Sequence, residues 1–163
     1  MIRAMLVLGA GLGLLAAQVS AQATPKFGDN CVATVEEYGK GCAGSAGRVA
    51  YLFAKERPFI GNYEFAFLVD NLCECSAVRV FCSLLPRTIQ LANCYVYIEP
   101  SLYVWDIGGM TDTGGFAIVP MSIPAFHELM GTELFCQAAV LDFNGEFFQL
   151  GSLSNGLHLT FGE

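Results

Sequence analysis

Short apolar segments, interrupted at close intervals by glycine, proline and asparagine, constrain this fold more than any other feature of the sequence. The breaks include Asn144-Gly145 and Asn155-Gly156, pairs that favour tight hairpin turns. The sequence shows neither a long amphipathic helix nor a strand-helix alternation, which disfavours α/β architectures. The spacing predicts an all-β domain, with strands expected at 49–54, 63–69, 76–84, 94–99, 102–107, 115–121, 134–143, 147–150 and 157–161.

In two of these segments apolar residues alternate with other residues, so that one face of the strand is apolar. Apolar residues occupy every second position of 63–69, and again of 157–161, where His158 lies on the polar face. We therefore expect an antiparallel two-sheet β-sandwich, of the jelly-roll or immunoglobulin-like Greek-key type. One short helical turn is expected at 124–130, because Pro124 opens and Gly131 closes a helix-like run.

The first 23 residues have the pattern of an export signal. Arg3 supplies a positive charge, an uncharged apolar run follows from Ala4 to Ala17, and Ala21 and Ala23 flank Gln22 as a cleavage site. Gln18 and Ser20 make the apolar run too short for a membrane anchor. We expect 1–23 to be a signal peptide, 24–47 a Cys/Gly-rich, irregular N-terminal segment, and 48–163 a β-sandwich domain in a secreted, extracellular or periplasmic protein.

Cleavage after Ala23 would leave 140 residues (163 minus 23), enough for one domain with a sizeable core. Arg3 would leave with the signal, so the remaining 7 basic and 15 acidic residues give a formal charge of −8. An acidic surface repels phosphate backbones and anionic headgroups. Nucleic acid is therefore not expected as a partner, and neither is membrane insertion after signal cleavage.

Seven cysteines follow the signal, and in an oxidising compartment cysteines are first expected to form disulfides. Cys73 and Cys75 would face opposite ways on a strand and so seek different partners. An odd count leaves one thiol over, which could join two copies as a disulfide-linked dimer. The candidates are Cys31, Cys42, Cys73, Cys75, Cys82, Cys94 and Cys136, and the spacing alone leaves their pairing open.

Metal and cofactor sites are not expected. Structural zinc needs two pairs of closely spaced ligands, and the one close cysteine pair has neither His127 nor His158 near it in sequence. Asp142, Asn144 and Glu146 place oxygen atoms at alternate positions around a glycine, which is a weak calcium pattern. The same residues are ordinary hairpin chemistry, and we prefer that interpretation.

Several blocks of the chain resemble an uncharacterised secreted domain of planctomycete-type bacterial secretomes. They are the opening Gly39-Lys40-Gly41-Cys42-Ala43-Gly44-Ser45-Ala46-Gly47, the segments 57–62 and 93–98, the block 134–142 with its Gln137-Ala138-Ala139-Val140-Leu141-Asp142, and Ser154-Asn155-Gly156-Leu157. The resemblance implies a compact β-sandwich and a Cys42–Cys94 disulfide. It carries no assigned activity, and this chain has five further cysteines.

Aromatic residues offer the strongest candidates for a binding surface. Tyr95, Tyr97, Tyr103 and Trp105 fall close together in two strand segments, and exposed rings bind sugar faces or protein surfaces. The competing interpretation, which we favour, is that these rings fill the core between the sheets.

No catalytic residues are identified. His127 and His158 could each act as a base, but no Gly-x-Ser-x-Gly motif accompanies them, and sequence alone cannot pair the carboxylates that glycoside hydrolysis needs. The favoured hypothesis is a secreted, non-catalytic module that binds carbohydrate or an extracellular protein. The alternative is a small extracellular hydrolase of the esterase or glycosidase type.

Overall fold

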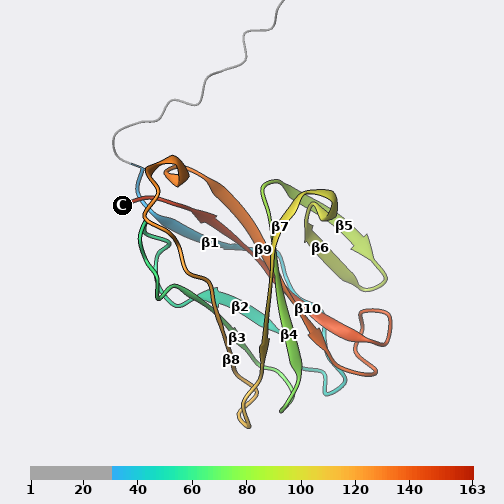
Figure 1. The fold of residues 1–163 in the computed structure, drawn as a ribbon. Coiled ribbons are helices and arrows are strands. Elements are labelled where there is room, and N and C mark those ends of the chain that lie inside the picture. Colours follow the sequence, from blue (N-terminus) through green and yellow to red (C-terminus); the bar gives the residue numbers. More distant parts are fainter. Residues whose placement is uncertain (1–30) are drawn as a thin grey trace, which may run out of the picture.

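The computed structural model describes residues 31–163, apart from the side chains of Tyr103 and Val104. The expected signal peptide at 1–23 lies outside the described residues. Two antiparallel sheets and a separate hairpin make up the fold (Figure 1). The five-stranded sheet contains β1 (Thr34–Tyr38), β10 (Gly151–Thr160), β9 (Glu133–Leu141), β4 (Ala77–Ser83) and β7 (Tyr103–Met110), in that order.

The second sheet has three strands, and the hairpin forms a third, smaller layer. The three-stranded sheet has the order β2 (Tyr51–Ala54), β3 (Ala66–Asp70) and β8 (Ala117–Pro120), and the hairpin pairs β5 (Pro86–Leu91) with β6 (Cys94–Ile98). The three-stranded sheet covers one face of the five-stranded sheet, while the hairpin lies on the other side (Figure 1). The expected all-β sandwich is confirmed.

The main core lies between the two sheets. The inward side chains of β9 and β10 meet those of β3, as the alternation predicted: Phe67 and Val69 face the core from β3, and Leu157 and Leu159 from β10, all with no exposed surface. Full burial of such a side chain stabilises by about 1.5 to 3 kcal/mol. The chain crosses from one sheet to the other several times, for example from β1 to β2 and from β3 to β4. Chain connections as well as core packing therefore join the two sheets.

Three local expectations differ from the structure. The segment 24–47 was expected to be irregular, but residues 34–38 form β1 and pair along β10. Residues 86–91 form β5, although Pro86 was interpreted as a break; Pro is tolerated at the first residue of an edge strand. Residues 147–150 are a turn that leads into β10 instead of a strand.

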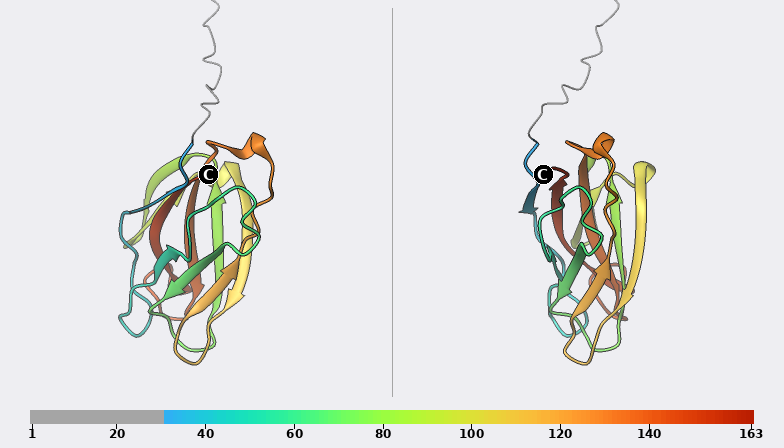
Figure 2. Two further views of the ribbon diagram at one scale, coloured as in Figure 1. Left: turned by 90° about the vertical axis from the view of Figure 1, so that its left-hand side faces the viewer. Right: turned by 60° about the vertical axis from the view of Figure 1, so that its left-hand side comes forward.

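Two short helical turns interrupt the strands, η1 (Pro100–Leu102) and η2 (His127–Leu129), and η2 confirms the helical turn expected within 124–130. The described chain is elongated, with strands running close to its long axis (Figure 2). Its two ends meet, since the amide of Glu163 donates to the carbonyl of Cys31 at 2.9 Å. In this part of the chain no helix is long and apolar enough to span a membrane.

Candidate functional site

A hollow of about 320 Å³ lies between the β5–β6 hairpin and the outer face of the five-stranded sheet. Val96, Ile98 and Pro100 form its roof. Among the residues that the structure describes, its lining is apolar except for Gln137. The floor and side come from β4, β9, β10 and the loop that joins the last two strands, through Phe81, Ala138, Ala139, Phe147 and Leu153.

Two further hollows extend this one along the same sheet face. A hollow of about 340 Å³ shares Phe81, Ala139 and Phe147 with the first. It shares Ala77 and Leu141 with a third hollow of about 520 Å³. We call the three together the outer groove, which runs from Pro100 at the hairpin to Phe143 in the β9–β10 loop.

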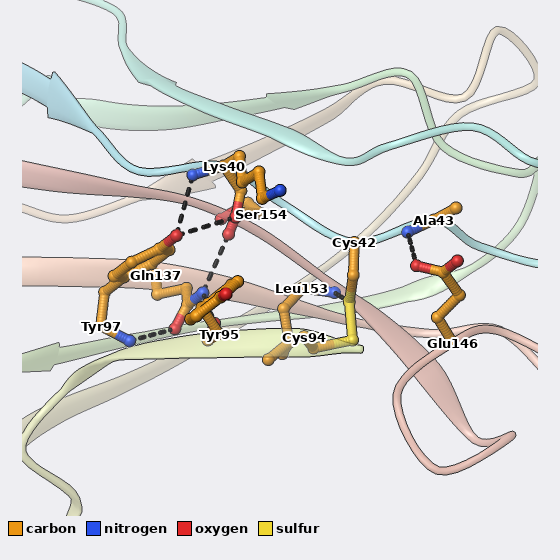
Figure 3. Close-up of a disulfide and its surroundings, with 10 residues drawn as sticks. All are labelled: Lys40, Cys42, Ala43, Cys94, Tyr95, Tyr97, Gln137, Glu146, Leu153 and Ser154. Atoms are coloured by element: carbon orange, nitrogen blue, oxygen red, sulfur yellow. Dashed lines mark hydrogen bonds between the residues drawn. A yellow bond between two sulfur atoms is a disulfide. The ribbon is translucent and has the colours of Figure 1, made fainter. Parts of the chain in front are cut away.

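Gln137 explains how the hairpin is held over the sheet. The Tyr97 amide donates to Gln137 Oε1 at 3.0 Å, and Gln137 Nε2 donates at 2.8 Å to the carbonyls of both Tyr95 and Ser154 (Figure 3). A side-chain amide on β9 thus joins β6 to the five-stranded sheet and also bonds the neighbouring strand β10. Since both amide hydrogens and the oxygen are engaged, Gln137 has no donor left for a ligand in the groove.

The Cys42–Cys94 disulfide anchors the other end of β6 (Figure 3). It was expected from the resemblance, and the structure confirms it. Cys42, Cys94 and Leu153 form a small buried cluster against which Val96 and Phe147 pack. The disulfide therefore ties the strand that forms the roof to the segment around Cys42, whose amide donates to the carbonyl of the floor residue Leu153 at 2.8 Å.

The second disulfide, Cys82–Cys136, joins β4 to β9 inside the main core. Cys73 and Cys75 lie in the loop between β3 and β4, not on a strand, so the expectation that they point to opposite faces does not apply. Neither of these two cysteines forms a disulfide in the structure.

The four aromatic candidates do not form one row. Tyr97 is buried, its hydroxyl accepts from the Lys40 amide at 2.9 Å and donates to the Lys40 carbonyl at 3.1 Å, and its ring stacks on that of Tyr95. Tyr95 is half-buried, with the Lys40 ammonium 5.9 Å from its ring centroid. Trp105 pairs with Cys82 across β7 and β4 and is 38 % exposed, and the side chain of Tyr103 lies outside the described residues.

Tyr38 packs beneath the hairpin against Tyr97. The rings meet edge to face at 5.4 Å, and the Tyr38 hydroxyl donates to the Tyr97 carbonyl at 3.3 Å. Burial, assisted by the neighbouring Tyr97, raises the pKa of Tyr38 to about 12. Tyr38 thus stays neutral where it supports the hairpin.

The weak calcium candidates are engaged in holding a loop. Asp142 Oδ2 accepts from the Ser45 amide at 2.8 Å, and Glu146 Oε2 accepts from the Ala43 amide at 2.9 Å. Asn144 adopts a positive φ of 72°, as a tight turn requires. Within residues 31–163, no group of three or more His, Cys, Asp and Glu side chains is arranged to hold a metal ion.

The histidines lie away from the outer groove's lining. His158 stacks on Phe135 with centroids 4.5 Å apart, and its two ring nitrogens lie 3.7 Å from Glu36 Oε2 and 3.8 Å from Glu133 Oε2. His127 lies on η2. The structure therefore places His158 beside two carboxylates, those of Glu36 and Glu133.

The sequence analysis did not predict the residues that line the groove, although one of them could have been noticed from the sequence. Gln137 is a single polar residue within the apolar run 134–141, and it is 3 % exposed. A buried polar residue needs partners, which in this case lie on a hairpin distant in sequence. Comparisons of the chain with protein families, with curated proteins and with solved structures find no match.

Proposed function

We propose that the mature chain is an exported, non-catalytic module that binds apolar side chains of a protein partner in the outer groove. The observation that carries this proposal is the lining of the first hollow, which is apolar on both roof and floor. Its one polar residue among those the structure describes, Gln137, uses its side-chain amide in hydrogen bonds to the backbone of the hairpin and of β10. A volume of about 320 Å³ lies at the lower end of the range of small-ligand pockets. It can take one or two large apolar side chains.

The lining favours protein over carbohydrate. A sugar brings hydroxyl groups that cost free energy when they are buried without hydrogen-bond partners. Apolar side chains gain about 25 cal/mol for each Å² removed from water. Large apolar side chains at the open end of the groove are also exposed, Leu141 by 51 % and Leu150 by 57 %, and such patches mark interaction surfaces.

The charges beside the groove support binding over catalysis. Of the described residues that line the first two hollows, Arg79 alone is charged, and its Nε donates to Asp106 Oδ1 at 2.7 Å. This ion pair raises the pKa of Arg79 and lowers that of Asp106, in each case first through the side-chain hydrogen bond. A paired guanidinium of this kind is a poor proton donor or acceptor.

Export is part of the same proposal. Its support is the signal pattern at 1–23 together with two disulfides, since disulfides persist in oxidising compartments. The direct check is to express the full chain in a bacterial host, and then to determine the N-terminus of the exported product. Export and a new N-terminus at Thr24 are expected, and a cytoplasmic, uncleaved chain would contradict this part.

Binding is tested on the mature chain with a displayed random-peptide library and with anilinonaphthalene sulfonate as an apolar probe. Enriched peptides are expected to carry large apolar side chains and to displace the probe. Ala139→Glu places a carboxylate in the groove and should weaken both ligands at least tenfold. Ala125→Glu, the same change at an exposed alanine outside the groove lining, should leave them unchanged.

Binding to a glycan array without peptide enrichment would contradict the proposed ligand class. Peptide binding that survives Ala139→Glu would contradict the proposed site. Both variants should first be shown to keep the far-ultraviolet circular dichroism of the parent chain.

A further inference from the structure

We propose that Cys73 and Cys75 form a redox-active dithiol that undergoes thiol-disulfide exchange with disulfides of other polypeptides. This activity goes beyond the proposed peptide binding, which depends on the first hollow, whereas the two thiols lie in the loop between β3 and β4 at the far end of the outer groove. Three observations carry it. The two thiols are separated by one residue in a turn, a carboxylate lies beside Cys73, and exposed apolar side chains surround Cys75.

The turn that carries the thiols is pinned by one hydroxyl. Thr111 Oγ1 donates to the Cys73 carbonyl at 2.9 Å and accepts from the Ser76 amide at 2.7 Å. Cys75 has a positive φ of 54°, which bends the chain. Residues two positions apart span at most about 7 Å when extended, so a bent chain brings their Cα atoms into the range that a disulfide requires.

The two thiols differ in the way that exchange requires. Cys75 is exposed and lines the third hollow of the outer groove. A substrate disulfide can therefore reach this residue. Cys73 is half-buried, and its Sγ lies 3.7 Å from Asp142 Oδ2. An exposed thiol suits the first attack, and a covered thiol beside a carboxylate suits ring closure.

The surroundings of Cys75 favour a polypeptide as the substrate. Met110, Leu141 and Phe143 line the same hollow and are 62 %, 51 % and 67 % exposed. Apolar residues that flank a disulfide in a polypeptide substrate would pack on these exposed side chains and remove them from water. Glutathione disulfide, which is polar, makes no such contact and serves as the reference substrate.

The exchange balances without any further reactant. The Cys75 thiolate attacks one sulfur of the substrate disulfide, a Cys75-substrate disulfide forms, and the released substrate thiolate takes up the proton that Cys75 lost. Cys73 then passes its proton to Asp142 and attacks Cys75 Sγ. The Cys73–Cys75 disulfide forms, the second substrate thiolate leaves, and it takes the proton from Asp142. The protein loses two electrons, and the substrate disulfide gains them.

The first test follows the mature chain in glutathione redox buffers, with alkylation and peptide mass mapping as the readout. The expected product is a peptide with an internal Cys73–Cys75 disulfide, whose fraction rises with the proportion of glutathione disulfide. Cys73→Ser should trap Cys75 as a mixed disulfide. Persistence of two free thiols, or of a Cys75 mixed disulfide in the parent chain, in every buffer would overturn the proposal.

The second test isolates Asp142. Asp142→Asn keeps an oxygen that can accept from the Ser45 amide, but it removes the proton acceptor beside Cys73. Ring closure should slow by about tenfold to a hundredfold, with formation of the mixed disulfide unchanged. Glu146→Gln is the matched control, since Glu146 also accepts an amide from the same loop, Ala43, and should close at the parent rate. Equal closure rates in the parent chain and Asp142→Asn would overturn the role of the carboxylate.

The third test concerns substrate class. A peptide disulfide flanked by leucine and phenylalanine should react about tenfold faster than glutathione disulfide, and Phe143→Ser should reduce that ratio. Equal rates for both substrates in the parent chain would overturn the polypeptide assignment.

Discussion

Asn155 exchanges two hydrogen bonds with the backbone of Leu52, as a neighbouring strand would. The Leu52 amide donates to Asn155 Oδ1 at 2.8 Å, and Asn155 Nδ2 donates to the Leu52 carbonyl at 3.0 Å. A register shift in β10 between Leu153 and Gly156 makes room for this contact. One side chain therefore joins β2, at the edge of the three-stranded sheet, to β10 of the five-stranded sheet, two strands that do not pair with each other within residues 31–163.

Replacing Asn155 should destabilise the protein strongly. Asn155→Ala leaves the amide and the carbonyl of buried Leu52 without partners, and each such group costs about 1 to 3 kcal/mol. We expect the free energy of unfolding to fall by about 2 to 4 kcal/mol, measured by urea denaturation with the disulfides intact. Gln90→Ala, at an exposed position of β5, is the control and should stay within about 0.5 kcal/mol of the parent. A similar loss for both variants would contradict the inter-sheet role.

The β-sandwich could be predicted from sequence because its core strands alternate. Phe67 and Val69 on β3, and Leu157 and Leu159 on β10, each bury one face, and a period of two shows this without knowledge of the partners. Edge strands lack that signal. Residues 34–38 of β1 are half-buried or exposed on both faces, so their pairing depends on the edge that β10 offers.

The candidate site could not be predicted, because its residues meet only through the hairpin. Val96 and Ala139 lie on different layers, and nothing local to either segment indicates that the layers stack. The aromatic candidates illustrate the same limit: Tyr97 gains its role from Lys40 and Gln137, which are distant in sequence. The Cys42–Cys94 pair, which the cysteine spacing alone left open, was expected only from a proposed resemblance to a secreted domain, and the disulfide is present.

Glu99, at the end of the hairpin, should titrate far below an ordinary glutamate. Hydrogen bonds from the Ser101 hydroxyl and then from Arg87 lower its pKa from 4.5 to about 2. The folded-state value lies below the unfolded one, so this stabilisation is present above about pH 4.5 and is lost as the pH falls to about 2. Carboxyl carbon NMR should show the low midpoint.

Arg87→Met should raise the pKa of Glu99 by removing one of these hydrogen bonds. The matched control is Lys55→Met, which removes a lysine 3.9 Å from Glu56 elsewhere on the surface and should leave Glu99 unchanged. An ordinary Glu99 midpoint in the parent chain would contradict the hairpin-end geometry.

Tyr38 should remain protonated in the folded protein to unusually high pH. Its pKa is raised to about 12, mainly by burial. Because the folded value exceeds the unfolded value of 10.0, this contribution is fully present below about pH 10 and is lost as the pH rises through about 12. Residue-specific ring carbon NMR should show the late transition, which Tyr38→Phe should remove and Tyr63→Phe, at an exposed ring, should not. Titration of Tyr38 near 10 would contradict its packing under Tyr97.

Loss of the Cys42–Cys94 disulfide should release the roof of the groove. This bond ties β6 to the segment between β1 and β2, while Gln137 of β9 and Tyr38 of β1 hold β6 to the five-stranded sheet through the backbone of Tyr95 and Tyr97. The double variant Cys42→Ser/Cys94→Ser should lower the free energy of unfolding by about 2 to 4 kcal/mol, because the bond closes a long loop. Amides of 94–98 should also exchange faster with deuterated water, before global unfolding.

The control for that release is Cys82→Ala/Cys136→Ala. This disulfide lies in the main core between two strands that remain paired by their backbone ladder, so its loss should weaken the whole fold without selective exchange at 94–98. Weaker binding of the apolar probe should accompany only the first double variant. Because Val96 and Ile98 form the roof on a strand that the Cys42–Cys94 bond anchors at its first residue, faster exchange there and loss of the hollow should occur together. Retention of full probe binding by a freely exchanging hairpin would show that the roof contributes nothing to the site.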